Sequence, residues 1–490
     1  MRIAIVGSGI AGLTAAHRLH PEHDITLFEA GDHVGGHVHT HEVTLGGRDY
    51  RIDTGFIVFN DWTYPNFIAL LDELGVASQA SDMSFSVSCG PSGLEYNGAT
   101  LNSLFAQRAN LLKPRFWGML RDILRFNREA PQLLEEEGNE LSLGDYLTAN
   151  AYGRLFRDYY ILPMGAAIWS TDPRLMLGFP ARFFIRFFLN HGLLAVKDRP
   201  VWRVVTGGSR SYVDRLIAPF RDRVRLNCPV THVERQEDRV ILHSPAGGAE
   251  TFDTVFLACH SDQALTLLGD PSPAEREVLT AIPYQPNEAV LHTDTRLLPR
   301  RPLAWAAWNY LMPEGPGGRL ALTYDMNILQ GLDAPETFCV TLNASEHIDP
   351  AKVLARVPYH HPLFTLEGAA AQIRQREING TDRTYYCGAW WRNGFHEDGL
   401  VSALATLDHF RADFGLPLGP APRPGMSPGH TQLQPEATTL TRGASSQTTA
   451  RSLSARDGSP PPSTGALTAY AAARTLAAPL ADHPCPAGTP

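Results

Sequence analysis

The chain has 490 residues, of which 43% are hydrophobic and 19% charged, and its formal net charge is −9. This composition is that of a globular protein and excludes a disordered or fibrous chain. The length exceeds what one hydrophobic core usually serves, so two domains or an interleaved pair are expected. The negative net charge gives no general electrostatic basis for binding nucleic acid.

The six cysteines are scattered, and no two form a Cys-x-x-Cys pair. They indicate neither a metal site nor a dithiol centre, and a reducing compartment fits them better than a disulfide framework. We expect no secretory signal, because glycines interrupt the apolar N-terminal run, and no apolar stretch reaches transmembrane length. The cytoplasm is therefore the expected location.

The N-terminal residues predict a dinucleotide-binding βαβ unit. A β-branched run over 2–6 predicts a strand, a Gly-x-Gly-x-x-Gly turn and a helix follow, and a second strand over 24–30 contains an acid near its end. The glycines allow a tight turn, close approach to a pyrophosphate and close helix–strand packing, and the helix N-terminus offers N–H groups to phosphates. The acid would accept hydrogen bonds from both ribose hydroxyls. The residues expected to bind the nucleotide are Gly7, Gly9, Ile10, Ala11, Gly12, Glu29 and Ala30.

Several later segments follow in a fixed order. A Gly-Gly loop at 35–36 precedes an Asp-x-Gly element at 53–55, and a second Gly-Gly segment over 204–220 leads into a predicted helix. A strand pair over 224–234, a strand over 253–265 and a closing aromatic and glycine-rich segment over 385–400 complete the series. In this order the segments resemble the flavin-containing amine oxidase superfamily, which includes protoporphyrinogen oxidases and carotenoid desaturases. The resemblance runs from residue 1 to about 414.

The resemblance implies an α/β fold with FAD as cofactor. A Rossmann-type FAD-binding domain would comprise 1–75, 200–265 and 380–414, and an inserted α+β substrate domain would comprise 76–199 and 266–379. A helix beginning near Asp398–Gly399 would point its N-terminus at the flavin N1–C2=O edge, where reduced flavin gathers negative charge. The further FAD contacts that the resemblance implies are Gly35, Gly36, His37, Asp53, Gly55, Val230, Gly388, Glu397, Asp398 and Gly399.

Three features depart from the family pattern. The Gly-Gly loop is flanked by His33 and His37 where typical members carry arginines, so one phosphate contact is weakened or replaced. The region 281–299 lacks the lysine that many amine oxidases place near flavin N5, which counts against ordinary amine oxidation. No second Gly-x-Gly-x-x-Gly unit is present, so oxygen or a quinone-like acceptor is the expected oxidant. His37, His39 and His41 alternate as metal ligands could, but we favour polar strand residues near the phosphates and expect no metal.

Candidate substrate-site residues come from three segments. Tyr64 follows the Asp-x-Gly element closely, with a capped helix start as the alternative interpretation. His360 and His361 precede a proline in a predicted loop of the second domain, where they could act as acid–base groups or be structural. Phe395 falls where amine oxidases keep an aromatic on the substrate face of the flavin. We favour positioning residues over a strong base, because hydride removal from an activated C–H bond does not require one.

The favoured function is dehydrogenation or desaturation of a small or lipid-like substrate by an FAD-dependent oxidoreductase. Two basic, aromatic and amphipathic segments, 111–126 and 179–194, indicate either a membrane-surface face or the mouth of a lipid-sized pocket, with ordinary core helices as the alternative. Peripheral contact with the inner face of a membrane would fit the first of these. Amine oxidation is the next candidate function, and a non-catalytic FAD-binding redox sensor or assembly partner is the third.

The C-terminal region, 415–490, is rich in proline, serine, threonine, glycine and alanine. It has too few large apolar residues to offset its chain entropy, which predicts a disordered tail with one short helix over 466–481.

Overall fold

The computed structural model describes residues 1–135, 141–245, 247–312 and 321–425. The chain divides into two compact units, Met1–Pro428 and Gly429–Pro490, and the second lies outside the described residues. Among the described residues, no helix is long and apolar enough to cross a membrane.

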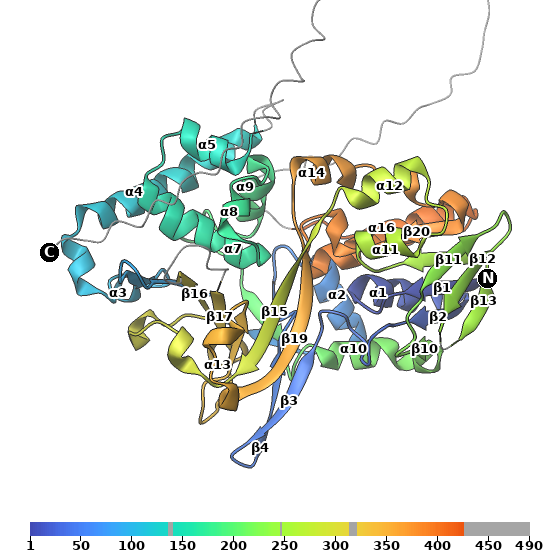
Figure 1. Cartoon of the computed structure of the whole chain (residues 1–490), viewed down its shortest axis with the longest axis horizontal. Coiled ribbons are helices and arrows are strands. Elements are labelled where there is room, and N and C mark those ends of the chain that lie inside the picture. The colour runs from blue at the N-terminus through green and yellow to red at the C-terminus, as the bar shows by residue number, and fades with distance from the viewer. Residues whose placement is uncertain (136–140, 246, 313–320, 426–490) are drawn as a thin grey trace, which may run out of the picture. The chain divides into compact units, whose positions relative to one another are not determined.

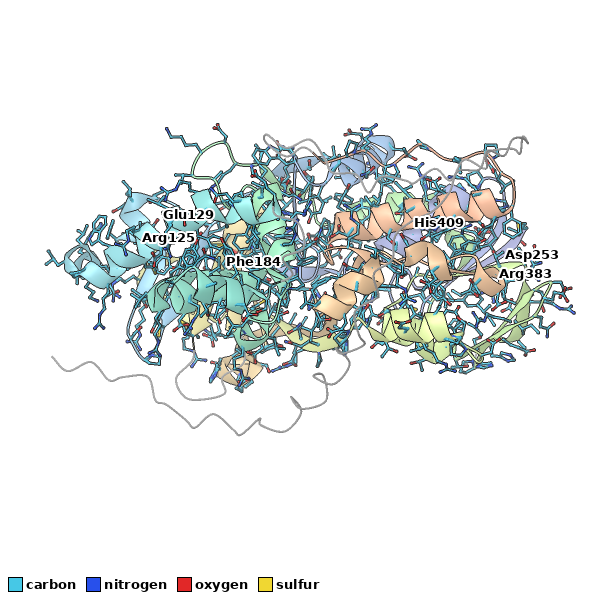
Figure 2. The ribbon with its side chains drawn as sticks, turned by 90° about the horizontal axis from the view of Figure 1, so that it is seen from above. Arg125, Glu129, Phe184, Asp253, Arg383 and His409 are labelled. Carbon is cyan, nitrogen blue, oxygen red and sulfur yellow. The ribbon has the colours of Figure 1, made fainter. Side chains whose placement is uncertain are left out.

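Five parallel strands form the sheet that carries the nucleotide motif, in the order β10-β2-β1-β14-β20. Their bounds are Arg2–Val6 for β1, Asp24–Phe28 for β2, Val224–Arg225 for β10, Thr254–Leu257 for β14 and Thr384–Tyr386 for β20. The central strands are apolar and almost fully buried, as expected where helices cover a parallel sheet. The predicted first strand is confirmed, and the second ends at Phe28, earlier than predicted. Figure 2 shows Arg383 beside Asp253, where its guanidinium donates to the Asp253 carbonyl at 3.4 Å and joins the starts of β20 and β14.

Helix α1 (Ile10–Leu19) packs against α16 (His396–Asp413), so the first and last helices of the nucleotide region are neighbours (Figure 1). Helix α16 begins at His396, two residues before the start predicted near Asp398. The other helices and strands nearby are α2 (Pro65–Leu74), α10 (Arg210–Ile217), α11 (Ser261–Leu267), α12 (Pro273–Thr280), α14 (Leu366–Gln372), α15 (Gln375–Ile378), β11 (His232–Arg235), β12 (Val240–Ser244) and β13 (Gly248–Phe252).

A second, seven-stranded sheet has the order β19-β15-β18-β17-β16-β7-β8 and is antiparallel except for the β16–β7 pair. Its strands are β7 (Phe85–Cys89), β8 (Glu95–Asn97), β15 (Tyr284–His292), β16 (Trp308–Met312), β17 (Ala321–Asp325), β18 (Cys339–Leu342) and β19 (Val353–Pro362). These strands come from the two ranges predicted for the substrate domain, so the α+β character of that region is confirmed. The domain boundaries themselves stay a prediction.

Helices gather at the other end of the unit from β1 and β2 (Figure 1). They share one large apolar core with the seven-stranded sheet, to which α9 contributes Phe184, buried among the helices in Figure 2. Their bounds are α3 (Leu101–Leu104), α4 (Pro114–Glu129), α5 (Leu143–Ala149), α6 (Arg154–Phe156), α7 (Leu162–Trp169), α8 (Pro173–Met176), α9 (Ala181–Asn190) and α13 (Met326–Gln330).

Two small sheets connect the regions. They are the hairpin β3 (Thr40–Leu45) with β4 (Arg48–Asp53), and the sheet of β5 (Val58–Asn60), β9 (Trp202–Val205) and β6 (Ser78–Ala80).

One loop prediction is wrong. His360 and His361 lie on β19, where they pair with Pro286 and Gln285 of β15. Prolines 358 and 362 suggested a loop, but β19 is an edge strand, and an edge strand tolerates residues that cannot donate to a ladder.

The start of the predicted tail packs against the body. The backbone N–H of Arg423 donates to Asn66 Oδ1 at 2.7 Å, and Asn66 Nδ2 donates back to the Arg423 carbonyl at 2.9 Å. The predicted tail thus contacts the body at Arg423, and the boundary at 415 stays a prediction. The remainder of the predicted tail, including the expected helix over 466–481, lies outside the described residues.

Candidate cofactor and substrate site

The glycine turn after β1 is shaped by backbone contacts. Gly7 has φ +103°, which disfavours any other residue, and a Cβ there would lie 2.8 Å from the Ala258 carbonyl oxygen. A Cβ at Gly12 would overlap the carbonyl oxygen of Gly7. At Gly9, in contrast, an added Cβ would meet nothing within 4 Å. Gly7 and Gly12 therefore close the turn, whereas Gly9 faces open space.

Hydrogen bonds of Glu29 and Ser8 hold this turn in place. Glu29 accepts hydrogen bonds from Ser8 N at 2.9 Å, Ser8 Oγ at 2.5 Å and Gly31 N at 2.8 Å. The hydroxyl of Ser8 also accepts from Gly35 N at 3.1 Å, which ties the Gly-Gly loop to the turn. Sequence reasoning missed Ser8, because the motif leaves that position unspecified.

A cavity of about 760 Å³ extends from the glycine turn into the region of the seven-stranded sheet. Most of the predicted site residues line it together. These are Gly7, Gly9, Ile10, Ala11, Glu29, Ala30, Gly35, Gly36, His37, Gly55, Tyr64, Val230, His360, His361, Gly388 and Phe395. The lining contains no lysine or arginine among the described residues, and its carboxylates are those of Glu29 and Asp262.

Five predicted cofactor residues do not line the cavity: Gly12, Asp53, Glu397, Asp398 and Gly399. Gly12 packs the turn, as the motif requires. A Cβ at Gly399 would lie 2.7 Å from Ile10 Cγ2. The absence of a side chain at this position therefore allows α16 to pack closely against α1.

The three carboxylates in this group are occupied by protein donors. Asp53 accepts from Thr40 Oγ1 at 2.5 Å and from Ser209 N and Oγ, and burial raises its pKa to about 6. Glu397 accepts from Asn66 N and Nδ2 and from Phe67 N, at the start of α2, and burial raises its pKa to about 7. Asp398 accepts from Phe395 N at 3.0 Å and caps its own helix. These carboxylates bind protein groups outside the cavity lining, and their predicted contacts with the cofactor stay predictions.

Asn60 has a similar local role. Its Oδ1 accepts from Trp62 N and Thr63 N, both at 2.9 Å, which holds the turn before α2, while Tyr64, the N-cap of α2, makes no side-chain cap bond. Tyr64 is buried and lines the cavity.

Four histidines gather on one wall of the cavity. His37 lies 6.4 Å from His260 and 5.4 Å from His361 between ring centroids, and His260 lies 6.4 Å from His360. Burial is the main cause that lowers the pKa of His37 and of His260 to about 4. Within the described residues, Nε2 of His37 is buried and has no hydrogen-bond partner. Sequence reasoning missed His260, because three separate chain segments supply this cluster.

The hydrogen bonds of His361 define its tautomer. Asn287 Oδ1 accepts from Asn343 Nδ2 at 2.6 Å, so the amide nitrogen of Asn287 is the group that faces His361 Nδ1, at 2.7 Å. Nδ1 therefore accepts, and the ring proton is on Nε2. Burial lowers the pKa of His361 to about 3. A neutral ring of this kind is a hydrogen-bond donor at neutral pH, which argues against the predicted acid–base role.

A fifth histidine, His396, lies in the first turn of α16 and also lines the cavity. Its ring stacks on Phe56 at 3.7 Å, and its Nε2 lies 2.7 Å from the hydroxyl of Tyr212. Burial lowers its pKa to about 3, so the ring is neutral. The only signal in the sequence was its place in the closing segment.

The end of the cavity away from the glycine turn is aromatic. Phe395 stacks on Phe187 at 4.9 Å, Phe187 lies 4.7 Å from Trp169, and Phe187 stacks on His191 at 3.8 Å. Trp202, Trp308, Tyr324, Phe364, Met83 and Met164 also line the cavity. We call these ten residues the aromatic compartment. Phe395, predicted from the resemblance, lies at its inner edge.

Comparison with known proteins shows the family to which the chain belongs. The sequence profile described as flavin containing amine oxidoreductase matches residues 10–320, so the chain belongs to this family. FAD is the cofactor of the homologues in this family. Coproporphyrinogen III oxidase of Mycobacterium tuberculosis (strain ATCC 25618 / H37Rv) is 25% identical over 302 residues, covering 56% of this chain. Flavin-containing amine oxidase A of Canis lupus familiaris is 26% identical over 254 residues, covering 49% of this chain and 46% of its own length.

The chain's match spans 64% of the coproporphyrinogen III oxidase. Among solved structures, a putrescine oxidase double mutant superimposes with a TM-score of 0.59 at 17% identity, covering 84% of this chain and 99% of the other. A fatty acid isomerase from P. acnes gives a TM-score of 0.58 at 17% identity, covering 82% and 96%. At such identities these structures confirm the fold alone.

The residues at the turn fit FAD. Gly9 opens onto the cavity, the N-terminus of α1 faces it, and the carboxylate residue Glu29 lines it. The unpartnered Nε2 of His37 supplies a buried polar atom beside the Gly-Gly loop.

Gly9 and Gly12 give a paired test of this fit. Gly9→Val should fold, because nothing lies near the added Cβ, but its side chain would occupy the space a pyrophosphate needs, lowering FAD affinity at least about tenfold. Gly12→Val should lose about 3 kcal/mol or more of stability through overlap with backbone. FAD titration and thermal unfolding of the apoproteins distinguish them. Full FAD binding by Gly9→Val would contradict the assignment.

The neutral state of His361 predicts a pH dependence. Its folded pKa of about 3 lies below the ordinary histidine value of 6.5, so the folded state resists protonation, and stability is lost as pH falls below 6.5. This loss reaches about 2 kcal/mol at pH 5. Urea unfolding of the apoprotein at pH 7.5 and pH 5 should show it, and His361→Gln should lessen it by that amount. His347→Gln, at an exposed histidine, is the control. Equal pH effects in wild type and His361→Gln would disprove the account.

Proposed function

We propose that the protein is an FAD-dependent oxidoreductase that dehydrogenates or desaturates an uncharged small or lipid-like substrate. One observation carries the proposal: a single cavity joins the glycine turn to an aromatic compartment that contains no charged side chain. Such a compartment favours an apolar molecule, because an ion entering it would lose its hydration without gaining a partner.

The chain's own residues would hold the cofactor at three points. Glu29 would accept from the ribose hydroxyls, while Gly9 and the N-terminus of α1 would receive the pyrophosphate. His37 would donate to a phosphate oxygen through the nitrogen that now lacks a partner. The N-terminus of α16 would direct its positive end at the redox-active ring. When bound, FAD supplies the acceptor for a hydride from the substrate.

On the substrate side, the residues of the chain would position the substrate and keep water away from it. The rings of Trp169, Phe187 and Phe395 exclude water and would fix the reacting C–H bond near the cofactor. His361 Nε2 is the protonated ring nitrogen, so it would act as a hydrogen-bond donor. We assign no strong base. His360 lines the cavity and stays a candidate for proton transfer.

Amine oxidation is the second candidate, favoured by the family's name and by the putrescine oxidase fold. A carboxylate that would bind an ammonium group is missing from the aromatic compartment as described, so an amine would have to enter in its neutral form. A non-catalytic, FAD-binding redox sensor or assembly partner is the third. Oxygen or a quinone-like molecule as the electron acceptor, and the cytoplasm or the inner face of a membrane as the location, stay predictions.

The proposal predicts which molecules bleach the bound flavin. Under anaerobic conditions, uncharged acyl or isoprenoid compounds should bleach it faster than polyamines, because the compartment offers no counter-charge. Phe395→Leu should slow bleaching at least about tenfold with FAD content unchanged, because it loosens substrate positioning.

Phe183→Leu is the matched control, since Phe183 packs behind Trp169 and does not line the cavity. Faster bleaching by polyamines would favour amine oxidation. No bleaching by any member of the panel would favour the non-catalytic candidate.

A further inference from the structure

The segment from α3 to α4 exposes an unusual number of large apolar side chains. Leu112 is 87% exposed, Leu101 77%, Leu124 59%, Trp117 50% and Leu111 46%. Single exposed leucines are common on proteins, but a contiguous group marks an interaction surface.

The same segment is strongly basic, although the chain as a whole carries a net charge of −9. Residues 101–128 contain six basic residues and one acid, and that acid, Asp122, is buried. Within the described part of the chain, Lys113, Arg115 and Arg121 form no ion pair, and their side chains are exposed. Arg128 pairs with Glu129 at 2.8 Å. The positive charge is therefore local and largely uncompensated.

The helix period brings the two kinds of side chain onto one face. Trp117, Arg121, Leu124 and Arg128 follow a spacing of four, three and four residues, which places them on one stripe of α4. The opposite stripe, with Phe116, Met119 and Phe126, is buried in the core. The outward stripe alternates apolar and cationic residues.

Hydrogen bonds and ring contacts hold this face in shape. Trp117 Nε1 donates to the Leu111 carbonyl at 2.9 Å, and the Trp117 ring lies 5.4 Å from that of Phe105. Arg108 donates to the carbonyls of Asn102 and Phe105 at 3.2 and 2.8 Å. The exposed leucines therefore belong to a segment whose backbone is held by hydrogen bonds and ring contacts. Figure 1 shows α3 and α4 at the edge of the unit far from β1 and β2, and Arg125 and Glu129 mark α4 in Figure 2.

We propose that this face, which comprises Leu101, Leu111, Leu112, Lys113, Trp117, Arg121 and Leu124, docks the protein on an anionic lipid surface. Leucine and tryptophan would enter the headgroup region, while lysine and arginine would meet anionic headgroups. The charge complementarity favours lipid over protein, because the centres of protein interfaces are depleted of charged residues whereas here cations lie between the apolar side chains. The inference does not depend on the proposed oxidoreductase function.

Vesicle flotation of the full chain with bound FAD tests the inference. Wild type should float with mixed phosphatidylcholine–phosphatidylglycerol vesicles, weakly with phosphatidylcholine alone, and less as salt rises. Lys113→Gln/Arg121→Gln should reduce partition at least about tenfold, since each cation near an anionic surface contributes separately. Leu101→Asn/Leu112→Asn should reduce it by a similar factor.

Matched controls lie outside the face. Ile373→Asn removes a side chain that is also 87% exposed, and Arg221→Gln/Arg276→Gln removes two exposed arginines. These variants should float like wild type, and all variants should keep their FAD content and melting temperature. Failure of wild type to float, or equal flotation of face and control variants, would overturn the inference. Self-association that only the face variants lose, without vesicle binding, would instead make the face a protein interface.

Discussion

The structure depends on how closely three distant pieces of backbone approach one another at the glycine turn. Gly7 and Gly12 leave no room for a Cβ against Ala258 and against the turn itself, and Gly399 leaves none against Ile10. The first strand, the returning strand and the closing helix thus meet at one point. Interior packing tolerates little added volume, so this convergence fixes where the cavity begins. The sheet order and the packing of α16 on α1 follow from it.

Acidic residues behind the cavity also join parts of the chain that are distant in sequence. Asp53 joins the β3–β4 hairpin to Ser209 at the start of α10, and Glu397 joins α16 to the start of α2. Each carboxylate satisfies backbone N–H groups that would otherwise be buried without partners. The walls are therefore supported from outside the cavity, and the surface facing the cofactor is left to glycines, neutral histidines and aromatic rings. This division accounts for a site with little side-chain charge.

Local patterns were readable in the sequence. The strand, glycine turn and helix at the N-terminus, and the position of the closing helix, depend on neighbours within a few residues. The roles of Asp53 and Glu397 were not readable, because their partners Ser209 and Asn66 are far away in the chain. The cluster of His37, His260, His360 and His361 was missed as a unit for the same reason. Prolines 358 and 362 misled the prediction of β19, since proline marks loops and edge strands alike.

The central claim is that the cavity holds FAD. The most direct test is the visible absorbance spectrum of the purified protein, followed by mass analysis of the cofactor released by heat. The account predicts a flavin spectrum and the mass of FAD. A colourless protein that does not take up added FAD, or one that releases NAD, would contradict it.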